Sequence, residues 1–368
     1  MHPVFGALGG GSVVMRDMVE CLARDPAIQV TVYARRWSGP VPATVRFERL
    51  DPFYLGSVMR DWTFERAIQR IDRSVFDLMV SDQKIAGIDV YIAGGGVHAE
   101  WVRRKQRTMP PWRRLFSRVQ PQTLYTTLAE RRVFRSAALR AVVCVSETVR
   151  RDVQRYFELP PERLHVVYNG IDLARFDHGF RSAQRQRLRA EMTLDGKTVL
   201  LFIGGGMRNK GILEALQAAS RCGLDFELLV VGKDKHLAEF RGAANALGIA
   251  NRCRFVGPQS DVRPYYAVAD LFLLPSHFET FGLVYLEALA MGVPVLASKA
   301  AGAAELIEDG VQGFRIDPDN VDDIAAKLRL LSQSAPAMEA DCVALARRYP
   351  REAMTERLAG VLKGLVHE

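Results

Sequence analysis

Cysteines are few in this sequence, and long hydrophobic runs are missing. Five cysteines occur in 368 residues, none of them in a Cys-x-x-Cys pair, which argues against a zinc site and a disulfide framework and fits a reducing compartment. No run of about 18 apolar residues occurs, so we expect no membrane-spanning helix. The opening residues MHPVFGALGGG lack the basic and apolar regions of a signal peptide, and we expect a cytoplasmic protein.

Positive charge is concentrated in the first half of the chain. Residues 1–170 hold 26 Lys and Arg against 17 Asp and Glu, a net charge of +9, whereas the remainder holds 24 against 25. One basic half predicts an anionic partner, such as nucleic acid, anionic lipid or a phosphorylated glycan.

Apolar runs alternate with amphipathic segments along most of the chain. This alternation, with strands that are apolar on both faces, predicts an α/β protein with parallel sheets covered by helices. Because 368 residues exceed what one hydrophobic core usually serves, and the pattern occurs twice, we expect two doubly wound, Rossmann-like domains. The expected strands are 28–34, 141–146, 164–169, 199–204, 226–232, 253–257, 271–275 and 294–298.

The segment VVYNGIDLARFDHG (166–179) passes from a strand to Asn-Gly and a polar stretch, which is typical of a domain boundary. We therefore predict an N-terminal domain over 1–168 and a C-terminal domain over 169–348. The tail 349–368 has the pattern of an amphipathic helix that could pack on either domain, and we assign it to the first.

The stretch HFETFGLVYLEALAMGVPVLAS (277–298) is mostly apolar but contains Glu279 and Glu287. Its pattern predicts a buried helix from about 282 to 291, ended by Gly292. The carboxylate of Glu287 inside that helix needs hydrogen-bond donors, since an unpaired buried polar group costs roughly 2–7 kcal/mol. Either a core arginine supplies them in an ion pair, or the hydroxyl groups of a ligand do.

Backbone amides at the start of this helix suit a phosphate group. Those of Phe281, Gly282 and Leu283 fall in the first turn, where no intrahelical acceptor exists, and a glycine lets an anion approach closely. With Glu279 and Glu287 on either side, the segment offers phosphate-binding amides between two hydroxyl-binding carboxylates. A nucleotide-sugar presents both a diphosphate and hydroxyl groups.

A second candidate for phosphate binding is VLLFIGGGMRNKGILEAL (199–216). A strand runs into three glycines, followed by Arg208, Lys210 and a helix, and this arrangement suits a diphosphate. It is not a Walker A loop, because it lacks Gly-Lys-Ser/Thr. The alternative is a tight turn with solvated cations.

Two glycine-rich turns lie in the N-terminal half. GALGGGSVVMRDM (6–18) fits the dinucleotide-binding fingerprint poorly, because only a vestigial strand precedes it and no acidic residue ends the next strand. It is either a tight turn or a substrate-facing loop between the domains. DVYIAGGGVHAEW (89–101) ends a strand in glycines before His98, which is either structural or active at the cleft.

The stretch WVRRKQRTMPPWRRLFSR (101–118) places seven cations among aromatic and aliphatic residues. This composition suits an anionic membrane surface, and it would also suit single-stranded nucleic acid. A solvated charged loop is the remaining alternative. Farther along, Asp317-Pro-Asp319 resembles a metal-binding Asp-x-Asp, but its place before a helix favours capping.

Together these motifs resemble family 4 of the retaining glycosyltransferases, which have the GT-B fold. The seven residues between Glu279 and Glu287 match the EX7E motif, VVYNGIDLARF matches an interdomain NGxD segment, and Lys210-Gly211 matches the Lys-Gly turn at the diphosphate. GPQSDVRPYYAVADLFLLPSHFETFG (257–282) and AGAAELIEDGVQGF (301–314) extend the resemblance, which covers nearly the whole chain. Within the family, RRWSGPVP, AGIDVYIAGGG and the basic stretch are most similar to the lipopolysaccharide core glucosyltransferases.

The resemblance implies a role for each candidate residue in a cleft between two domains. Glu287 would bind the ribose hydroxyls, and Glu279 would act as a catalytic residue on the hydroxyls of the transferred sugar. Lys210 would hold the diphosphate with the helix amides, helped by Arg208. The wider set comprises main chain at Gly257, Pro258 and Gln259 for uracil, the amides of Phe281, Gly282 and Leu283, and Gly10, Gly11, Gly95 and His98 on the acceptor side, with Lys210 and His98 also counted as catalytic.

The reaction that the resemblance implies is a retaining transfer of a hexose, glucose before others, from a UDP-sugar to a membrane-associated glycan such as the lipopolysaccharide core. The leaving phosphate would take the acceptor proton on the front face. We expect no metal, no cofactor besides the donor substrate and no nucleic-acid partner, with a peripheral location on the inner face of the cytoplasmic membrane through 101–118. The alternatives are UDP-N-acetylglucosamine or GDP-mannose as donor, a sugar-nucleotide epimerase, and a basic nucleic-acid-binding protein.

Three positions depart from the family pattern. Gly205 stands where many members carry an arginine, so that Arg208 would have to replace its contact. Val13-Val14 stand where Glu/Gln-Arg is frequent, and Gly95 stands where the core glucosyltransferases have an aspartate. These departures touch the acceptor side or its edge, so the donor chemistry is better supported than the identity of the acceptor.

Overall fold

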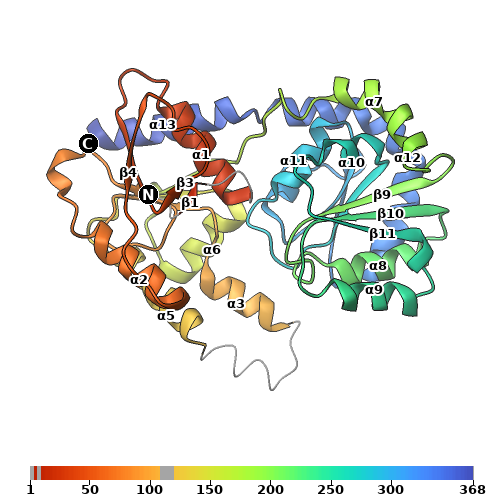
Figure 1. Cartoon of the computed structure of the whole chain (residues 1–368), viewed down its shortest axis with the longest axis horizontal. Helices are drawn as coiled ribbons and strands as arrows, with labels where there is room; N and C mark the ends of the chain where they lie inside the picture. Colours follow the sequence, from red (N-terminus) through yellow and green to blue (C-terminus); the bar gives the residue numbers. More distant parts are fainter. Residues whose placement is uncertain (1–3, 6–9, 108–119, 368) are drawn as a thin grey trace. The chain divides into compact units, whose positions relative to one another are not determined.

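The computed structural model describes residues 4–5, 10–107 and 120–367, and the chain divides into two units (Figure 1). Unit 1 comprises Met1–Asn169 with Arg351–Glu368, and unit 2 comprises Gly170–Pro350. Parallel strands and helices build both units, which confirms the predicted α/β class.

Unit 2 contains one parallel sheet of six strands. The strand order is β11-β10-β9-β12-β13-β14, so the chain moves outward from β9 to β11 and then returns to place β12 beside β9. Three of these strands, β10, β12 and β13, are buried along their whole length, because helices cover both faces. The strands are β9 (Thr198–Ile203), β10 (Phe226–Val231), β11 (Cys253–Gly257), β12 (Leu271–Leu274), β13 (Val295–Ser298) and β14 (Gly313–Ile316), with Thr198 alone half-buried in β9.

Helices flank this sheet on both sides, with α8 and α9 on one side and α10 and α11 on the other (Figure 1). The long helix α12 packs against both α8 and α11, and α7 packs against α10. The helices are α7 (His178–Glu191), α8 (Ile212–Arg221), α9 (Leu237–Ala246), α10 (Arg263–Val268), α11 (Leu283–Ala290) and α12 (Val321–Arg347), with short 3-10 turns η3 (Ala250–Arg252) and η4 (Gly302–Leu306).

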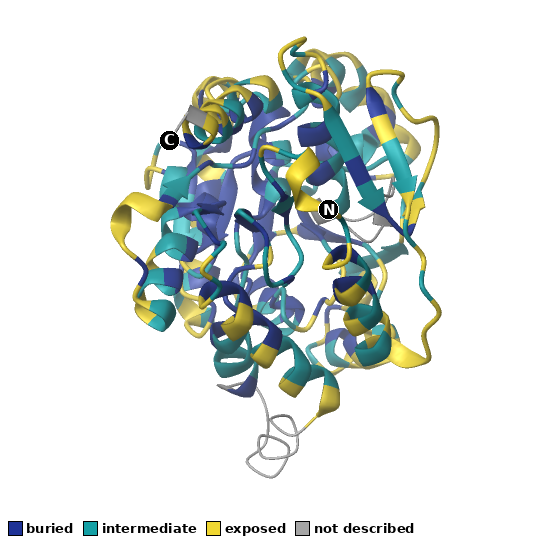
Figure 2. Cartoon of the chain, turned by 90° about the vertical axis from the view of Figure 1, so that its left-hand side faces the viewer, coloured by how far each residue is buried: buried dark blue, intermediate teal, exposed yellow. Residues whose placement is uncertain are grey.

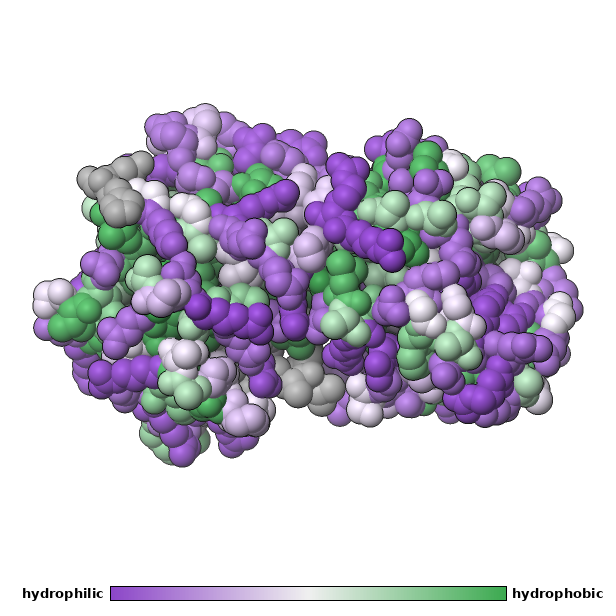
Figure 3. Space-filling model, turned by 90° about the horizontal axis from the view of Figure 1, so that it is seen from above, coloured by the Kyte–Doolittle hydropathy of each residue, from purple (hydrophilic) through white to green (hydrophobic). Residues whose placement is uncertain are grey.

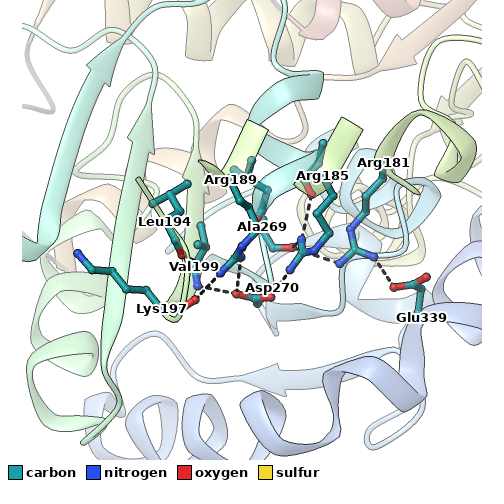
Figure 4. A network of polar contacts seen from close by, with 11 residues as sticks. Arg181, Arg185, Arg189, Leu194, Lys197, Val199, Ala269, Asp270 and Glu339 are labelled. Carbon is teal, nitrogen blue, oxygen red and sulfur yellow. Dashed lines mark hydrogen bonds and ion pairs between the residues drawn. The ribbon is translucent and has the colours of Figure 1, made fainter. Parts of the chain in front are cut away.

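Three arginines of α7 form polar contacts with residues at the central strands of the sheet (Figure 4). Arg181, Arg185 and Arg189 are spaced four residues apart, so they project from one side of the helix. Arg185 and Arg189 both form ion pairs with Asp270, the residue before β12, and the Val199 amide of β9 donates to the same carboxylate at 2.7 Å. The carboxylate therefore joins α7 to the two central strands.

Unit 1 has a more broken arrangement than the single doubly wound sheet that we expected. Its parallel strands fall into a group of four, in the order β5-β6-β7-β8, and two pairs, β1-β3 and β2-β4. Figure 2 shows buried strands in this unit, with helices whose outer surfaces are exposed. The strands are β1 (Val4–Phe5), β2 (Val30–Ala34), β3 (Arg36–Trp37), β4 (Val45–Arg49), β5 (Val80–Ser81), β6 (Val90–Ala93), β7 (Ala141–Cys144) and β8 (Leu164–Val166).

The C-terminal helix α13 (Arg351–His367) belongs to unit 1 and packs on α1 (Gly10–Leu22). Met354 and Leu358 of α13 share a buried core with Met15 and Met18 of α1. The apolar side of the tail is thereby covered. The described residues of unit 1 also form α2 (Gly56–Ile68), α3 (His98–Arg107), α5 (Pro121–Phe134) and α6 (Glu147–Phe157), with 3-10 turns η1 (Arg73–Val75) and η2 (Pro161–Arg163).

Hydrophilic residues predominate on the face of the molecule that Figure 3 shows, and hydrophobic residues are scattered among them. Within the described parts of the chain, no helix combines the length and the apolar character that crossing a bilayer requires. The predicted peripheral contact with a membrane falls largely on residues 108–119, which lie outside the described residues.

The ion pairs of Asp270 with Arg185 and Arg189 predict that neutralising Asp270 costs more stability than neutralising an exposed carboxylate. Asp270→Asn keeps the shape but removes the charge that faces two arginines, and it should lower the free energy of unfolding by about 3 kcal/mol. The control Glu191→Gln removes the partner of Arg187 from an exposed pair on α7, and it should cost at most about 0.5 kcal/mol. Urea unfolding of both variants checks this, and equal losses would contradict the role of Asp270.

Candidate functional site

The neighbouring strands β9 and β12 form the topological switch point of unit 2. The chain leaves β9 toward one edge of the sheet and leaves β12 toward the other, so the segments that follow them diverge. In open parallel sheets, ligands bind at the carboxyl ends of such a strand pair. We call the two segments at this place the β9 loop (204–211) and the β12 loop (275–282).

Hydrogen bonds and a close backbone approach join the two loops. The His277 amide donates to the Asn209 carbonyl oxygen at 2.9 Å, and the Asn209 side-chain amide donates to the Phe278 carbonyl oxygen at 3.0 Å. Gly211 has a φ of 76°, and a Cβ added there would overlap the carbonyl oxygen of Pro275 and lie 2.7 Å from its carbonyl carbon. Only glycine fits this contact without displacing a loop.

The two loops bring Lys210 and Glu279 together in an ion pair. Both side chains are largely buried, with exposed fractions of 20% and 17%. Burial lowers the pKa of Lys210 to about 8. Lys210, the predicted phosphate-binding cation, and Glu279, the predicted sugar-binding carboxylate, are therefore in contact in the ligand-free protein.

The β12 loop is held on its other side by the segment after β13. The Glu279 amide donates to the Ala300 carbonyl oxygen at 3.1 Å, and the Gly302 amide donates to the Glu279 carbonyl oxygen at 3.1 Å. Gly282 then takes a φ of 93° at the N-cap of α11, which begins at Leu283. The Tyr285 amide donates to the Gly282 carbonyl oxygen at 3.0 Å, which leaves the Leu283 and Val284 amides of the first turn without an acceptor in the helix.

Glu287 lies on α11 and receives its hydrogen bond from a tyrosine. The fully buried Tyr266 of α10 donates from its hydroxyl group to Glu287 Oε2 at 2.8 Å. Burial raises the pKa of Glu287, while the Tyr266 hydrogen bond and the positive charge of Arg175 oppose that shift. Among the described residues no arginine forms an ion pair with Glu287, and Arg175 acts on it only through its charge.

Arg208, the other predicted phosphate contact, forms an ion pair with Glu239 of α9. Both side chains are about half exposed, at 47% each, and the guanidinium lies 5.9 Å from the centre of the Phe240 ring. At Gly205, where an arginine is frequent in the resembled family, an added Cβ would come no closer than 3.5 Å to other atoms. The position therefore has room for a side chain, which this sequence does not use.

The predicted base contacts follow the end of β11. Gly257 takes a φ of 84°, and its carbonyl oxygen accepts from the Gly232 amide at 2.9 Å, which ties β11 to the end of β10. Pro258 is exposed and Gln259 is half-buried just beyond it. Their main chain thus lies at the same end of the parallel sheet as the β9 loop, the end where the strands finish.

Two residues near this site were not predicted from the sequence. Tyr266 is one, and His277 of the β12 loop is the other, with Nε2 at 3.0 Å from Glu214 Oε1 and Nδ1 at 3.7 Å from Asp319 Oδ1. The capping role expected for Asp317 and Asp319 is wrong in detail. The N-cap of α12 is Asn320, which accepts from the Asp323 amide at 3.1 Å, while Asp317 accepts from the Asp319 amide just before it.

His98 is the first residue of α3 in unit 1. Its amide donates to Glu130 Oε1 at 2.8 Å, so a carboxylate of α5 already covers the start of the helix. Burial and the charge of Lys84 lower the pKa of His98 to about 4, and the ring stacks on Trp101 at 5.4 Å. The imidazole is therefore neutral at pH 7, which allows it to accept or donate one proton.

The other predicted acceptor-side residues also lie in unit 1. Gly95 is exposed in the turn between β6 and α3, with open space where a side chain would stand. Gly10 and Gly11 are the first two residues of α1.

Part of the basic stretch 101–118 has a structural role. Arg103 and Arg104 of α3 each lie 2.6 Å from a carboxylate oxygen of Glu100, and the Tyr156 hydroxyl group donates to it at 2.9 Å. Burial opposes the charge of Glu100, but these hydrogen bonds outweigh it and lower its pKa to about 2. Two of the cations thus compensate a buried carboxylate, and the segment beyond Arg107 is not described.

Across the described residues, no group of three or more His, Cys, Asp and Glu side chains is arranged to hold a metal ion. The cation that the structure places between the two central loops is the ammonium group of Lys210.

Two family profiles match the chain in succession. "Glycosyltransferase Family 4" matches residues 8–175, and "Glycosyl transferases group 1" matches residues 184–348. A D-inositol 3-phosphate glycosyltransferase of Mycobacterium sp. (strain KMS) is 37% identical over 48% of this chain and 41% of its own length. Lipopolysaccharide glucosyltransferase WaaG of Escherichia coli (strain K12) is 25% identical over 83% of this chain and 82% of its own.

An α-D-kanosaminyltransferase of Streptomyces kanamyceticus is 29% identical over 64% of this chain and 62% of its own length. This chain therefore spans less than two thirds of the length of that relative. Among solved structures, WaaG, a glycosyltransferase involved in lipopolysaccharide biosynthesis, superposes with a TM-score of 0.83 at 23% identity, over 98% of both chains. Anabaena Alr3699/HepE in complex with UDP and glucose superposes with a TM-score of 0.74 at 20% identity, over 99% of this chain and 100% of that one. These likenesses confirm the predicted GT-B fold.

The contact between the loops predicts an unequal effect of two glycine substitutions. Gly223→Ala has open space and only a positive φ to overcome, so it should lower the free energy of unfolding by about 1 kcal/mol. Gly211→Ala also overlaps Pro275 and should cost about 1–3 kcal/mol more. Urea unfolding compares the two variants. Equal costs would show that the loops do not approach as the structure has them.

The raised pKa of Glu287 predicts that its neutral isostere stabilises the ligand-free protein. Because the folded-state pKa is raised, the stability of the protonated form is present below about pH 4, the ordinary Glu pKa, and is lost as the pH rises through the folded value. Glu287→Gln should therefore melt at a higher temperature than the wild type at neutral pH, and this gain should vanish in acid. A variant that is less stable at neutral pH would contradict the account.

Proposed function

Because the chain belongs to the family 4 glycosyltransferases, we propose that it transfers a hexose from a UDP-sugar to a membrane-associated glycan, with retention of the anomeric configuration. The proposed sugar is glucose and the proposed acceptor resembles the lipopolysaccharide core. The observation that carries the donor half of this proposal is the convergence of Lys210, Glu279 and α11 at the β9–β12 switch point.

The donor site follows from the charges and hydrogen-bonding groups at that place. A diphosphate needs positive charge and N–H donors, and Lys210 and the first-turn amides of α11 supply both. Carboxylates suit hydroxyl groups, and we assign Glu287 to the ribose and Glu279 to the transferred sugar. Main chain at Pro258 and Gln259 is assigned to the uracil.

In the proposed reaction, the bond between sugar C1 and the diphosphate oxygen breaks while the acceptor oxygen bonds to C1 on the same face. The acceptor proton passes to the leaving phosphate oxygen, so no protein base is consumed. Lys210 and the α11 amides stabilise the negative charge that develops on the departing UDP. A pKa of about 8 leaves Lys210 mostly protonated at pH 7, and a bound diphosphate favours the charged form further. We propose that neither a metal ion nor a cofactor takes part.

The acceptor half is supported by charge and by one relative. Residues 1–170 carry a net charge of +9, which suits a phosphorylated glycolipid, and WaaG is a lipopolysaccharide glucosyltransferase. We assign Gly10, Gly11, Gly95 and the neutral His98 to the acceptor side. A peripheral location at the cytoplasmic face of the membrane would rest on cations of 101–118 other than Arg103 and Arg104, which bind Glu100.

The proposal predicts selective binding of uridine nucleotides that depends on Glu287. Titration calorimetry should detect UDP and UDP-glucose, and Glu287→Ala should weaken both by roughly 100-fold, because two hydroxyl contacts to a charged group are lost. Glu191→Gln, on the exposed side of α7, should bind as the wild type does.

Other donors give other outcomes. Binding of GDP-mannose alone would overturn the uridine assignment, and tighter binding of UDP-N-acetylglucosamine than of UDP-glucose would overturn the glucose assignment. Mass spectrometry and NMR of the products complete the test. An α-linked product from an α-linked donor supports retention, and an epimerised UDP-sugar formed without acceptor would contradict transfer.

A further inference from the structure

His277 lies in the β12 loop two residues before Glu279, and no role has yet been assigned to it. Its side chain is 11% exposed and points away from bulk solvent into a group of carboxylates. The two ring nitrogens face different elements. Nε2 lies 3.0 Å from Glu214 Oε1 in the first turn of α8, and Nδ1 lies 3.7 Å from Asp319 Oδ1 before α12.

This geometry fits a doubly protonated ring. A neutral imidazole has one N–H group and one bare nitrogen, so one of the two carboxylates would face a lone pair. An imidazolium presents an N–H group on both sides, donating a hydrogen bond to Glu214 and facing Asp319 at the longer distance of an ion pair. The charged groups that act on the ring are Glu214 of α8 and Asp319 and Asp317 of the segment before α12, and all of them are negative.

The direction of titration agrees with the geometry. The hydrogen bond to Glu214 raises the pKa of His277 above its ordinary value, against the opposing effect of burial. A raised folded-state pKa means that the contribution to stability is fully present below about pH 6.5, the ordinary His value, and is lost as the pH rises through the folded value. The exposed Asp319 contributes less than the half-buried Glu214, because solvent screens it.

Through these contacts His277 joins the two loops of the donor site from two directions. Its amide donates to the carbonyl oxygen of Asn209, the residue before Lys210, at 2.9 Å. Its ring holds Glu214, which lies four residues after Lys210 and on the helix that follows the β9 loop. The position of Lys210 opposite Glu279 is thus fixed at both ends by one residue.

We propose that His277 is a positioning residue, which in its charged form locks the β9 loop to the β12 loop and so holds Lys210 and Glu279 in register for a diphosphate. The proposal rests on the proposed donor function of the two loops. Loss of the ring proton removes the positive charge that both carboxylates contact, and the attachment of the β9 loop to the β12 loop becomes weaker. Donor binding therefore weakens as the pH rises, through a residue that does not touch the donor.

The test compares His277→Gln with the wild type by calorimetry with UDP at about pH 6 and about pH 9, on either side of the expected transition. Lys210 and the phosphates of UDP titrate in the same range in both proteins, so the ratio of their dissociation constants isolates His277. The variant should bind roughly ten-fold more weakly at the lower pH, the loss expected for a charge-assisted hydrogen bond. The ratio should fall to about one at the higher pH.

Two further variants keep the test decisive. Glu214→Gln retains His277 but removes the negative charge of its main partner, so it should weaken UDP binding at low pH in the same direction, even if His277→Gln does not fold. His165→Gln, on β8 of unit 1, is the control and should follow the wild type at both pH values.

The outcomes separate this inference from the proposed function. If the wild type binds UDP and both variants bind it equally well at low pH, the inference is overturned while the donor assignment stands. A ten-fold loss that is equal at both pH values would show a structural effect and would also overturn it. If no protein binds UDP, the donor assignment fails and this inference fails with it.

Discussion

The close approach of the β9 and β12 loops is the constraint on which the rest of unit 2 depends. Gly211 passes against the carbonyl group of Pro275, and Asn209 exchanges hydrogen bonds with the β12 loop, so that the loops cannot move independently. Because β9 and β12 are neighbours and the chain leaves them in opposite directions, this contact closes the end of the sheet where ligands bind. The Asp270 network holds the same two strands from their other ends.

The site contains two charged groups whose environment disfavours their charged forms. Lys210 and Glu287 are both buried enough to disfavour their charged forms, and each has only limited compensation in the ligand-free protein. Lys210 has Glu279, and Glu287 has the hydroxyl group of Tyr266. Perturbed groups of this kind are frequent at functional sites, where a ligand supplies the missing partners. Stability and donor binding should therefore change in opposite directions when Glu287 is made neutral.

Much of unit 2 could be predicted from the sequence, because its strands are continuous apolar runs between turns. The helix expected from about 282 to 291 is α11, Leu283–Ala290. The strands β3, β4, β5 and β14 were missed, since charged residues interrupt β3, β4 and β14 and β5 has only two residues. Within the site, Lys210 and Glu279 were each predicted from their own motif, but their ion pair was not, and Tyr266 and His277 do not belong to any spacing pattern. Their partners come from distant segments, and only the folded chain brings them together.

The central claim is that a uridine diphosphate binds at the carboxyl ends of β9 and β12 in unit 2. A crystal structure of the protein with UDP tests it most directly. The account predicts the diphosphate against Lys210 and the first turn of α11, with the ribose hydroxyls on Glu287. Nucleotide bound elsewhere, such as at the glycine-rich start of α1 in unit 1, would contradict it.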